Sequence, residues 1–267
     1  MKCGFIGCGN MGGALATAVR KGNREIAILL ADNDTPKRDA LCEILQASAA
    51  TAEEVATECD VFFLGVKPQG MKGLLEQISC VLTKRNPAPL IITMAAGVTT
   101  NTITDLIGVA LPVVRIMPNT PVQLGCGMIE VCRNQTATDE QIDLALDLLK
   151  EAGNLDVIPE DLIDAASALS GSGPAFAYYF AEQLMAGAKQ CGIPEDKLVE
   201  YTAQTLLGAA QMMLKGDKTP EELRIAVCSP GGSTLAGLTA MQTEAFDTAV
   251  QDTVKRAFAR SKELGKV

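Results

Sequence analysis

Six residues near the start of the chain have the types and spacing of a phosphate-binding loop. They are Gly7, Cys8, Gly9, Asn10, Met11 and Gly12, and they join an apolar stretch, residues 3–6, to an alanine-rich stretch, residues 11–20. The first glycine of this pattern makes a tight turn, the second lets the backbone approach a pyrophosphate, and the third lets helix and strand pack closely. The loop therefore predicts a dinucleotide site.

An acidic residue, Asp32, follows the second apolar stretch, residues 26–31. A carboxylate at this point usually accepts hydrogen bonds from the adenosine ribose and repels a 2′-phosphate, which favours NADH over NADPH. Lys37 and Arg38 lie close behind, however, and offer the positive charge that such a phosphate needs. The sequence leaves the choice between NADH and NADPH open.

A second group of residues suited to chemistry lies near the C-terminus, in the run Ser229-Pro230-Gly231-Gly232-Ser233-Thr234. Glycines permit close approach of a ligand, proline stiffens the turn, and the start of a helix near Ser233 offers free N–H groups to an anion. A plain helix cap needs only one hydroxyl residue, so this run favours a binding site for a small carboxylate. The run Ser170-Gly171-Ser172-Gly173-Pro174 has a similar composition, although Ser172 there can simply cap a helix.

Composition narrows the chemistry further. The chain has 267 residues and no histidine, so the commonest general acid and base is absent and no metal site is expected. The formal net charge of −9 argues against nucleic acid or an anionic membrane as a partner. Nine cysteines with irregular spacing predict reduced thiols and a cytoplasmic protein. Neither a signal peptide nor a membrane span is expected.

The elements that must position these residues alternate between strand and helix up to about residue 158. Apolar strands are predicted at residues 3–6, 26–31, 61–65, 90–94, 113–116 and 154–158, and helices at 11–20, 36–47, 71–82, 100–107 and 138–151. A capping box is predicted at 51–54, and further caps at Thr138 with Gln141 and at Thr219 with Glu222. Strands that are apolar on both faces indicate a parallel sheet covered on both sides. The fold class is therefore α/β, with an N-terminal Rossmann doubly wound sheet.

Only helices are predicted beyond residue 161, at 174–191, 194–214, 219 onward, 233–241 and 244–263. We therefore expect two domains, a dinucleotide-binding domain at 1–160 and an all-helical substrate and dimerisation domain at 161–267. Several of these helices are apolar on more than one face and need additional partners, which predicts a homodimer.

Further motifs resemble one known family. They are Val66-Lys67-Pro68, Ala95-Ala96-Gly97, the run from Arg115 to Pro121, and the two hydroxyl-rich runs at 170–175 and 229–234. Together they are similar to Δ1-pyrroline-5-carboxylate reductase over essentially the whole chain. That resemblance implies hydride transfer from NADPH or NADH to the C=N bond of pyrroline-5-carboxylate, giving proline, in dimers that can assemble into larger rings such as decamers.

The resemblance also implies roles for particular residues. Cofactor contacts are expected at the glycine loop and at Asp32, Asn33, Val66, Lys67, Pro68, Ala95, Ala96 and Gly97. Substrate contacts are expected at Ser170, Ser229, Gly231, Gly232, Ser233 and Thr234, with Thr234 as the catalytic residue. Asp32 departs from the small neutral residues of NADPH-preferring members, and Ala226 replaces a more usual acidic or amide residue.

Two other classes of protein remain open. A β-hydroxyacid dehydrogenase would use a catalytic lysine in the helical half, where Lys189 lacks the expected glycine-asparagine setting. A non-catalytic dinucleotide sensor would leave the run 229–234 without a purpose.

Thr234 is a weak acid, so we expect it to orient the substrate and to relay a proton. Lys67 is expected to act through its backbone.

Overall fold

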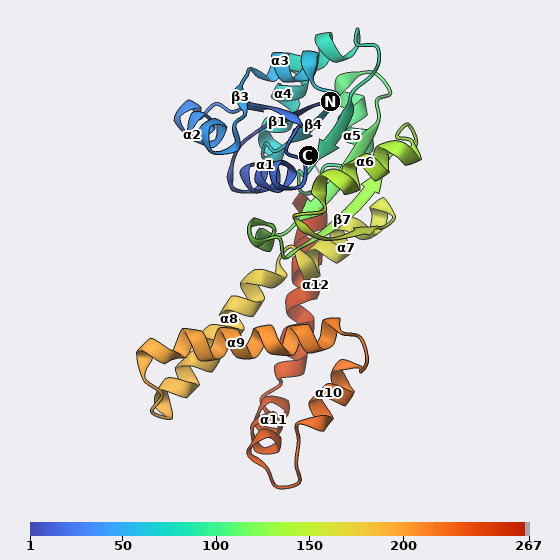
Figure 1. Ribbon diagram of the computed structural model, residues 1–267. Coiled ribbons are helices and arrows are strands. Elements are labelled where there is room, and N and C mark those ends of the chain that lie inside the picture. Colours follow the sequence, from blue (N-terminus) through green and yellow to red (C-terminus); the bar gives the residue numbers. More distant parts are fainter. Residues whose placement is uncertain (265–267) are drawn as a thin grey trace. The chain divides into compact units, whose positions relative to one another are not determined.

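The computed structural model describes residues 1–264, which form two compact units (Figure 1). Unit 1 consists of Met1–Pro174 together with the chain from Ala257 on, and unit 2 consists of Ala175–Arg256. The first unit contains all the strands that the structure describes, and the second contains only helices. This confirms the expected combination of a doubly wound α/β half and an all-helical half.

One sheet of eight strands forms the centre of unit 1, in the order β3-β2-β1-β4-β5-β6-β7-β8. The strands are β1 (Lys2–Ile6), β2 (Ala27–Ala31), β3 (Ser48–Ala49), β4 (Val61–Leu64), β5 (Leu90–Thr93), β6 (Val113–Pro118), β7 (Gly127–Arg133) and β8 (Gly153–Val157). Because β2 and β4 lie on opposite sides of β1, the strand order reverses there. In open α/β sheets such a reversal creates a crevice at the carboxyl ends of the strands.

The far edge of the sheet departs from the purely parallel arrangement that the sequence predicts. Strand β7, which was not predicted, runs antiparallel to β6, and β8 is parallel to β7. Only a short 3₁₀ turn, η1 (Thr120–Leu124), connects β6 to β7. A connection of that length is too short for the crossover that parallel neighbours require, so β7 returns alongside β6.

Six helices form the two main cores with the faces of the sheet. Helices α1 (Asn10–Gly22), α2 (Thr35–Leu45) and α6 (Asp139–Leu149) contribute to one core, and α3 (Ala52–Glu58), α4 (Pro68–Leu82) and α5 (Thr100–Ile107) contribute to the other. Alternate residues of each central strand enter different cores. Phe5 and Phe63 stack at 4.5 Å between ring centroids in the first core, while Ile6 and Leu64 pack in the second.

Local signals place several helix starts well. Thr51 and Thr138 form complete capping boxes with Glu54 and Gln141, as the sequence predicts. Helix α5 covers the predicted residues, whereas α4 begins at Pro68, three residues before the predicted start. Proline explains this earlier start. The first residue of a helix does not use its N–H in an intrahelical hydrogen bond, so proline, which has no N–H, is well suited to that position.

The remaining helices are α7 (Glu160–Ser170), α8 (Gly173–Gln190), α9 (Glu195–Leu214), α10 (Pro220–Ala226), α11 (Ser233–Thr243) and α12 (Phe246–Leu264). Leu198 is the single buried side chain within residues 175–256, all of which the structure describes. Large apolar side chains such as Tyr179, Val199, Leu207 and Leu214 are between 51% and 76% exposed. A helical unit of this size with so little core leaves most of its apolar surface in contact with water.

The helices begin at Glu160, at the predicted domain boundary, but α7 belongs to unit 1. Ile163 of this helix is fully buried against Met117 of β6 and Cys132 of β7. The first compact unit therefore extends to Pro174 and includes α7, so the boundary between the two units lies one helix after the last strand. The boundary at residue 160 stays a prediction about domain organisation.

Candidate active site

Each glycine of the loop between β1 and α1 is required by a different contact. Gly7 has a φ of +100°, and a Cβ there would lie 2.6 Å from the carbonyl carbon of Gly65. A Cβ on Gly12 would collide with the carbonyl oxygen of Gly7. A Cβ on Gly9 would instead enter open space with nothing within 4 Å. Two glycines thus hold the turn against its neighbours, and the third keeps a hollow free for a ligand.

The N-terminus of α1 directly follows this loop and has backbone donors that no side chain caps. Gly9 is the N-cap, and no side chain among the described residues caps the helix. The first N–H groups of a helix have no intrahelical acceptor and carry partial positive charge. A loop that is open at Gly9 and leads into an uncapped 13-residue helix fits the pyrophosphate of a dinucleotide.

Asp32 connects the glycine loop to the end of β2. Its Oδ2 accepts a hydrogen bond of 2.5 Å from the backbone N–H of Cys8, and its Oδ1 accepts one of 2.8 Å from the N–H of Asp34. The carboxylate is therefore held by backbone donors on both sides. A carboxylate offers about four lone-pair positions, so it retains acceptor capacity for a ligand.

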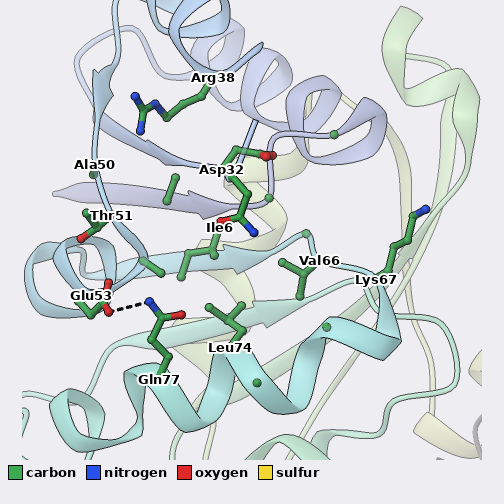
Figure 2. A pocket seen from close by; sticks show the side chains of 18 residues that line it. Ile6, Asp32, Arg38, Ala50, Thr51, Glu53, Val66, Lys67, Leu74 and Gln77 are labelled. Carbon is green, nitrogen blue, oxygen red and sulfur yellow. Dashed lines mark hydrogen bonds between the residues drawn. The ribbon is translucent and has the colours of Figure 1, made fainter. Parts of the chain in front are cut away.

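A cleft of about 790 Å³ opens beside these residues, at the carboxyl ends of β1, β2 and β4. Six of the predicted cofactor contacts line it, namely Gly7, Gly9, Asp32, Asn33, Val66 and Lys67. Figure 2 shows Asp32 at the end of its strand and Val66 on the neighbouring segment after β4. The cleft thus coincides with the reversal of strand order at which α/β sheets bind nucleotides.

The opposite wall of the cleft comes from residues that the sequence analysis did not assign to the site. Ala50, Thr51, Ala52 and Glu53 line it from the start of α3, and Gln77 lines it from α4. Gln77 Nε2 donates a hydrogen bond of 2.7 Å to Glu53 Oε1 (Figure 2), and this bond lowers the pKa of Glu53. The capping box at Thr51 predicted a helix start but no ligand contact. The sequence around Gln77 contains no motif that indicates a place in the cleft.

The remaining predicted cofactor contacts do not line this cleft. Cys8 and Asn10 line a neighbouring hollow of about 400 Å³ beside α1 and α2. Burial raises the pKa of the Cys8 thiol to about 12. Pro68 starts α4, and Ala95 and Gly97 are buried in a turn after β5, where Gly97 has a φ of +74°. Met11 is half-buried in the first turn of α1.

The run at residues 229–234 forms a turn that leads into α11 in unit 2. Gly231 has a φ of +69°, which favours glycine, and the N–H of Gly232 donates to the carbonyl of Ser229 at 3.0 Å. Gly232 is the N-cap of α11, which has no side-chain cap within the described chain. Ser233 and Thr234, the first residues of the helix, are exposed. This second uncapped helix start has hydroxyl groups beside its free N–H groups.

Ser170 has a different setting from the run at 229–234. Its hydroxyl donates to the carbonyl of Ala166 at 3.1 Å, within α7. Its own carbonyl accepts a hydrogen bond of 2.9 Å from Asn119 Nδ2, and Asn119 Oδ1 accepts from the N–H of Met128. Asn119 therefore fixes the end of α7 to the loop between β6 and β7, a link that the sequence analysis did not identify.

None of the helices within residues 1–264 combines the length and the apolar character that a membrane span requires. In the same residues, no group of three or more histidine, cysteine, aspartate or glutamate side chains is arranged to hold a metal ion.

Comparisons with known proteins match both halves of the chain. Residues 160–264 match a family model described as pyrroline-5-carboxylate reductase dimerisation, and residues 2–97 match one described as NADP oxidoreductase coenzyme F420-dependent. Pyrroline-5-carboxylate reductase 3 of Rattus norvegicus is 34% identical over 99% of this chain and 96% of its own length. The Escherichia coli enzyme of that name is 32% identical over 99% and 98%.

Solved structures agree with these matches. A pyrroline-5-carboxylate reductase from Coxiella burnetii superposes with a TM-score of 0.91 at 31% identity, covering 99% of this chain and 98% of the other. A Plasmodium falciparum pyrroline carboxylate reductase with NADP bound has a TM-score of 0.89 at 28% identity, covering 100% and 98%. A 3-hydroxyisobutyrate dehydrogenase from Mycobacterium tuberculosis, 13% identical with a TM-score of 0.53, shares the fold alone.

A Rossmann unit with a complete glycine loop and a nucleotide cleft, followed by a helical unit, defines an NAD(P)H-dependent oxidoreductase. Similarity over nearly the full length specifies the class further: the chain belongs to the pyrroline-5-carboxylate reductase family. The match to 160–264 supports oligomerisation through the helical half.

Proposed function

We propose that this chain reduces the C=N bond of 1-pyrroline-5-carboxylate to L-proline, with Thr234 and its neighbours holding the substrate. The observation that carries this assignment is the uncapped start of α11 in a chain that also has a complete dinucleotide loop. Two glycines and two hydroxyl residues at that helix start suit a small carboxylate better than a simple cap does.

The substrate carboxylate is bound in this proposal by main-chain donors. The N–H groups at the start of α11 supply hydrogen bonds and the positive end of the helix dipole, and Ser229, Ser233 and Thr234 add hydroxyl groups. Gly231 and Gly232 allow the carboxylate to approach the backbone. No arginine is needed for this mode of binding, so the run can serve a carboxylate without a cationic side chain.

When bound, NAD(P)H supplies a hydride to the carbon of the C=N bond, and the nitrogen gains one proton. Binding in a fixed orientation and exclusion of water contribute most to such a step. The hydroxyl of Thr234, which has no hydrogen-bond partner within residues 1–264, is free to orient the imine nitrogen and to relay its proton. An unperturbed hydroxyl is a poor acid, so orientation is the main role that we assign to Thr234.

The cofactor is assigned to the glycine loop, Asp32, Asn33, Val66, Lys67, Pro68 and the turn at 95–97. Lys67 acts through its backbone in this proposal, because it is the N-cap residue of α4 and its side chain is exposed. Ser170 supports the end of α7 through its bond to Ala166, so its contribution to the substrate site is indirect. Lys67→Met is therefore expected to keep its activity.

We also propose a homodimer formed through the helical half, with larger rings such as a decamer built from dimers. The exposed apolar side chains of unit 2 and the match to a dimerisation family support this assembly. A cytoplasmic location is proposed because all nine cysteines are free thiols, which fits a reducing compartment.

The assignment of Thr234 is tested by steady-state kinetics with pyrroline-5-carboxylate and NADH or NADPH. Thr234→Ala should lower kcat/KM by about 10²-fold, as expected when an orienting group is lost, and Thr234→Ser should restore most of it. Thr239→Ala is the matched control, because Thr239 lies on the same helix and its hydroxyl already donates to the Leu235 carbonyl. Unchanged kcat and KM in Thr234→Ala would show that this hydroxyl has no part in the reaction.

A further inference from the structure

One end of the cleft contains the carboxylate of Asp32. Asp32 lies at the carboxyl end of β2 with both oxygens fixed by the N–H groups of Cys8 and Asp34. These two bonds occupy about half of its lone-pair positions and leave the others for two neighbouring hydroxyl groups. The same bonds prevent the carboxylate from turning away when a ligand enters.

The start of α2, the other group that could hold a phosphate here, is already occupied. Asp34 is the N-cap of this helix, and its carboxylate accepts from the N–H of Lys37 at 3.2 Å. A carboxylate at a helix N-terminus uses the free N–H groups and the positive dipole that would otherwise attract a phosphate. The helix start that could otherwise attract a 2′-phosphate is therefore already capped by a carboxylate.

The two cations that the sequence left as candidates are directed to other partners. Lys37 lines the hollow beside α1, where its Nζ is 3.4 Å from Asn10 Oδ1. Arg38 does line the cleft (Figure 2), but its Nε and Nη2 both contact Asp39 Oδ1, at 2.8 and 2.7 Å. Both cations of residues 32–39 therefore have a partner, Asn10 for Lys37 and Asp39 for Arg38. The carboxylates of Asp32 and Asp34 instead accept hydrogen bonds from backbone N–H groups.

From this arrangement we infer that the chain selects NADH over NADPH, with Asp32 as the residue that determines the choice. Asp32 accepts hydrogen bonds from the ribose hydroxyls of NADH and repels the 2′-phosphate of NADPH, while Arg38 remains paired with Asp39. The inference rests on the proposed function for the reaction, but it concerns the adenosine end of the cofactor and can be tested without turnover.

Binding of cofactor and of its fragments is the direct test. Calorimetric titration at low salt should show NAD⁺ binding about tenfold or more tightly than NADP⁺, and adenosine 2′,5′-bisphosphate should bind more weakly than 5′-AMP. Kinetics with pyrroline-5-carboxylate should give a matching preference in kcat/KM. Tighter binding of NADP⁺ would overturn the inference. Preferential binding of NAD⁺ without any reduction of pyrroline-5-carboxylate would instead contradict the proposed function and leave the inference standing.

Two variants assign the effect to particular residues. Asp32→Ser should reduce the NAD⁺ to NADP⁺ affinity ratio about tenfold or more, and the loss should appear in KM for NADH rather than in kcat. Asp39→Asn frees Arg38 without touching the ribose end, so it should tighten NADP⁺ binding and leave NAD⁺ binding unchanged. If Asp32→Ser does not fold, the NAD⁺ to NADP⁺ affinity ratio of the wild-type protein and the effect of Asp39→Asn still test the inference. An unchanged ratio in a folded Asp32→Ser protein, or in Asp39→Asn, would contradict the role given to these side chains.

Discussion

At the scale of single residues, the glycine loop shows that identical residue types serve different purposes a few positions apart. Gly7 and Gly12 are required by contacts within the fold, whereas Gly9 borders open space in the cleft. Gly13, one position later in the helix, has only ordinary contacts at 3.5 Å. A methyl group added at each of these glycines should therefore affect either the stability of the fold or the binding of the cofactor, depending on the position.

Alanine substitutions at these glycines should therefore have three distinct outcomes. Gly12→Ala should destabilise the fold by about 1–3 kcal/mol, because its Cβ collides with backbone. Gly9→Ala should fold normally and weaken NADH binding by about tenfold or more, since the methyl group enters the space kept for the pyrophosphate. Gly13→Ala, the control, should stabilise the helix by about 0.5–1 kcal/mol.

Urea unfolding and calorimetric titration with NADH measure both quantities on the same protein samples. If a folded Gly9→Ala protein bound NADH with wild-type affinity, the pyrophosphate would not lie at this position of the loop.

The sequence predicted the positions of those candidate residues that directly follow a strand. The loop at 7–12, Asp32 and the segment at Val66 are adjacent to strand ends, and six of the predicted contacts do line one cleft. Glu53 and Gln77 were missed, because they lie 24 positions apart and meet only when α3 and α4 pack together. Long-range pairs of this kind leave no periodic pattern in a single sequence.

At the scale of elements, a buried arginine holds α7 to the sheet. Arg115 of β6 is 1% exposed, and its guanidinium contacts Asp164 at 2.9 Å and Glu160 at 3.6 Å. The Glu160 carboxylate also accepts from the N–H and the hydroxyl of Thr100, at 2.7 and 2.8 Å, at the start of α5. This network explains why α7 belongs to the compact unit of the sheet although a change to helices begins at Glu160.

Removing this arginine should weaken the fold markedly. Arg115→Met leaves two partly buried carboxylates without their cation, and we expect a loss of about 1–3 kcal/mol, below the range for fully buried pairs. The exposed pair of Asp147 and Lys150 provides the control, because Asp147→Ala should change stability by less than about 0.5 kcal/mol. Urea unfolding measures both, and equal effects would show that the buried network has no special role.

Element prediction succeeded where a helix or strand had its own signal. Capping boxes at Thr51, Thr138 and Thr219 are all present. Strand β7 was missed because its sequence contains Glu130, which is nevertheless only 3% exposed, and β3 has two residues, too few for a pattern. The antiparallel turn of β7 depends on the short connection through η1, which apolar runs do not reveal.

At the scale of the whole molecule, the two units differ greatly in how much apolar surface they bury. Unit 1 contains two cores that include fully buried phenylalanine and leucine side chains, whereas unit 2 buries only Leu198 among its described residues. Helices that leave so many large apolar side chains exposed in one chain are stabilised by covering them with a second chain. The sequence predicted this need from helices that are apolar on more than one face.

Light scattering after size-exclusion chromatography should therefore give at least twice the 28.0 kDa mass of one chain at micromolar concentration. Leu207→Glu combined with Leu214→Glu places two charges on one face of α9 and should reduce the mass or unfold unit 2. Ile44→Glu, at an exposed apolar residue on α2, is the matched control and should leave the mass unchanged. A wild-type monomer would contradict the proposed assembly.

The central claim is that this chain couples oxidation of a reduced nicotinamide to reduction of a small carboxylated imine. The most direct test mixes the purified protein with 1-pyrroline-5-carboxylate and NADH or NADPH, follows the loss of nicotinamide absorbance, and measures the proline formed. The structure predicts oxidation in step with proline formation, faster with NADH, and about 10²-fold less efficient in Thr234→Ala. No oxidation with either cofactor, by a protein that binds dinucleotide and has its full oligomeric mass, would contradict the account.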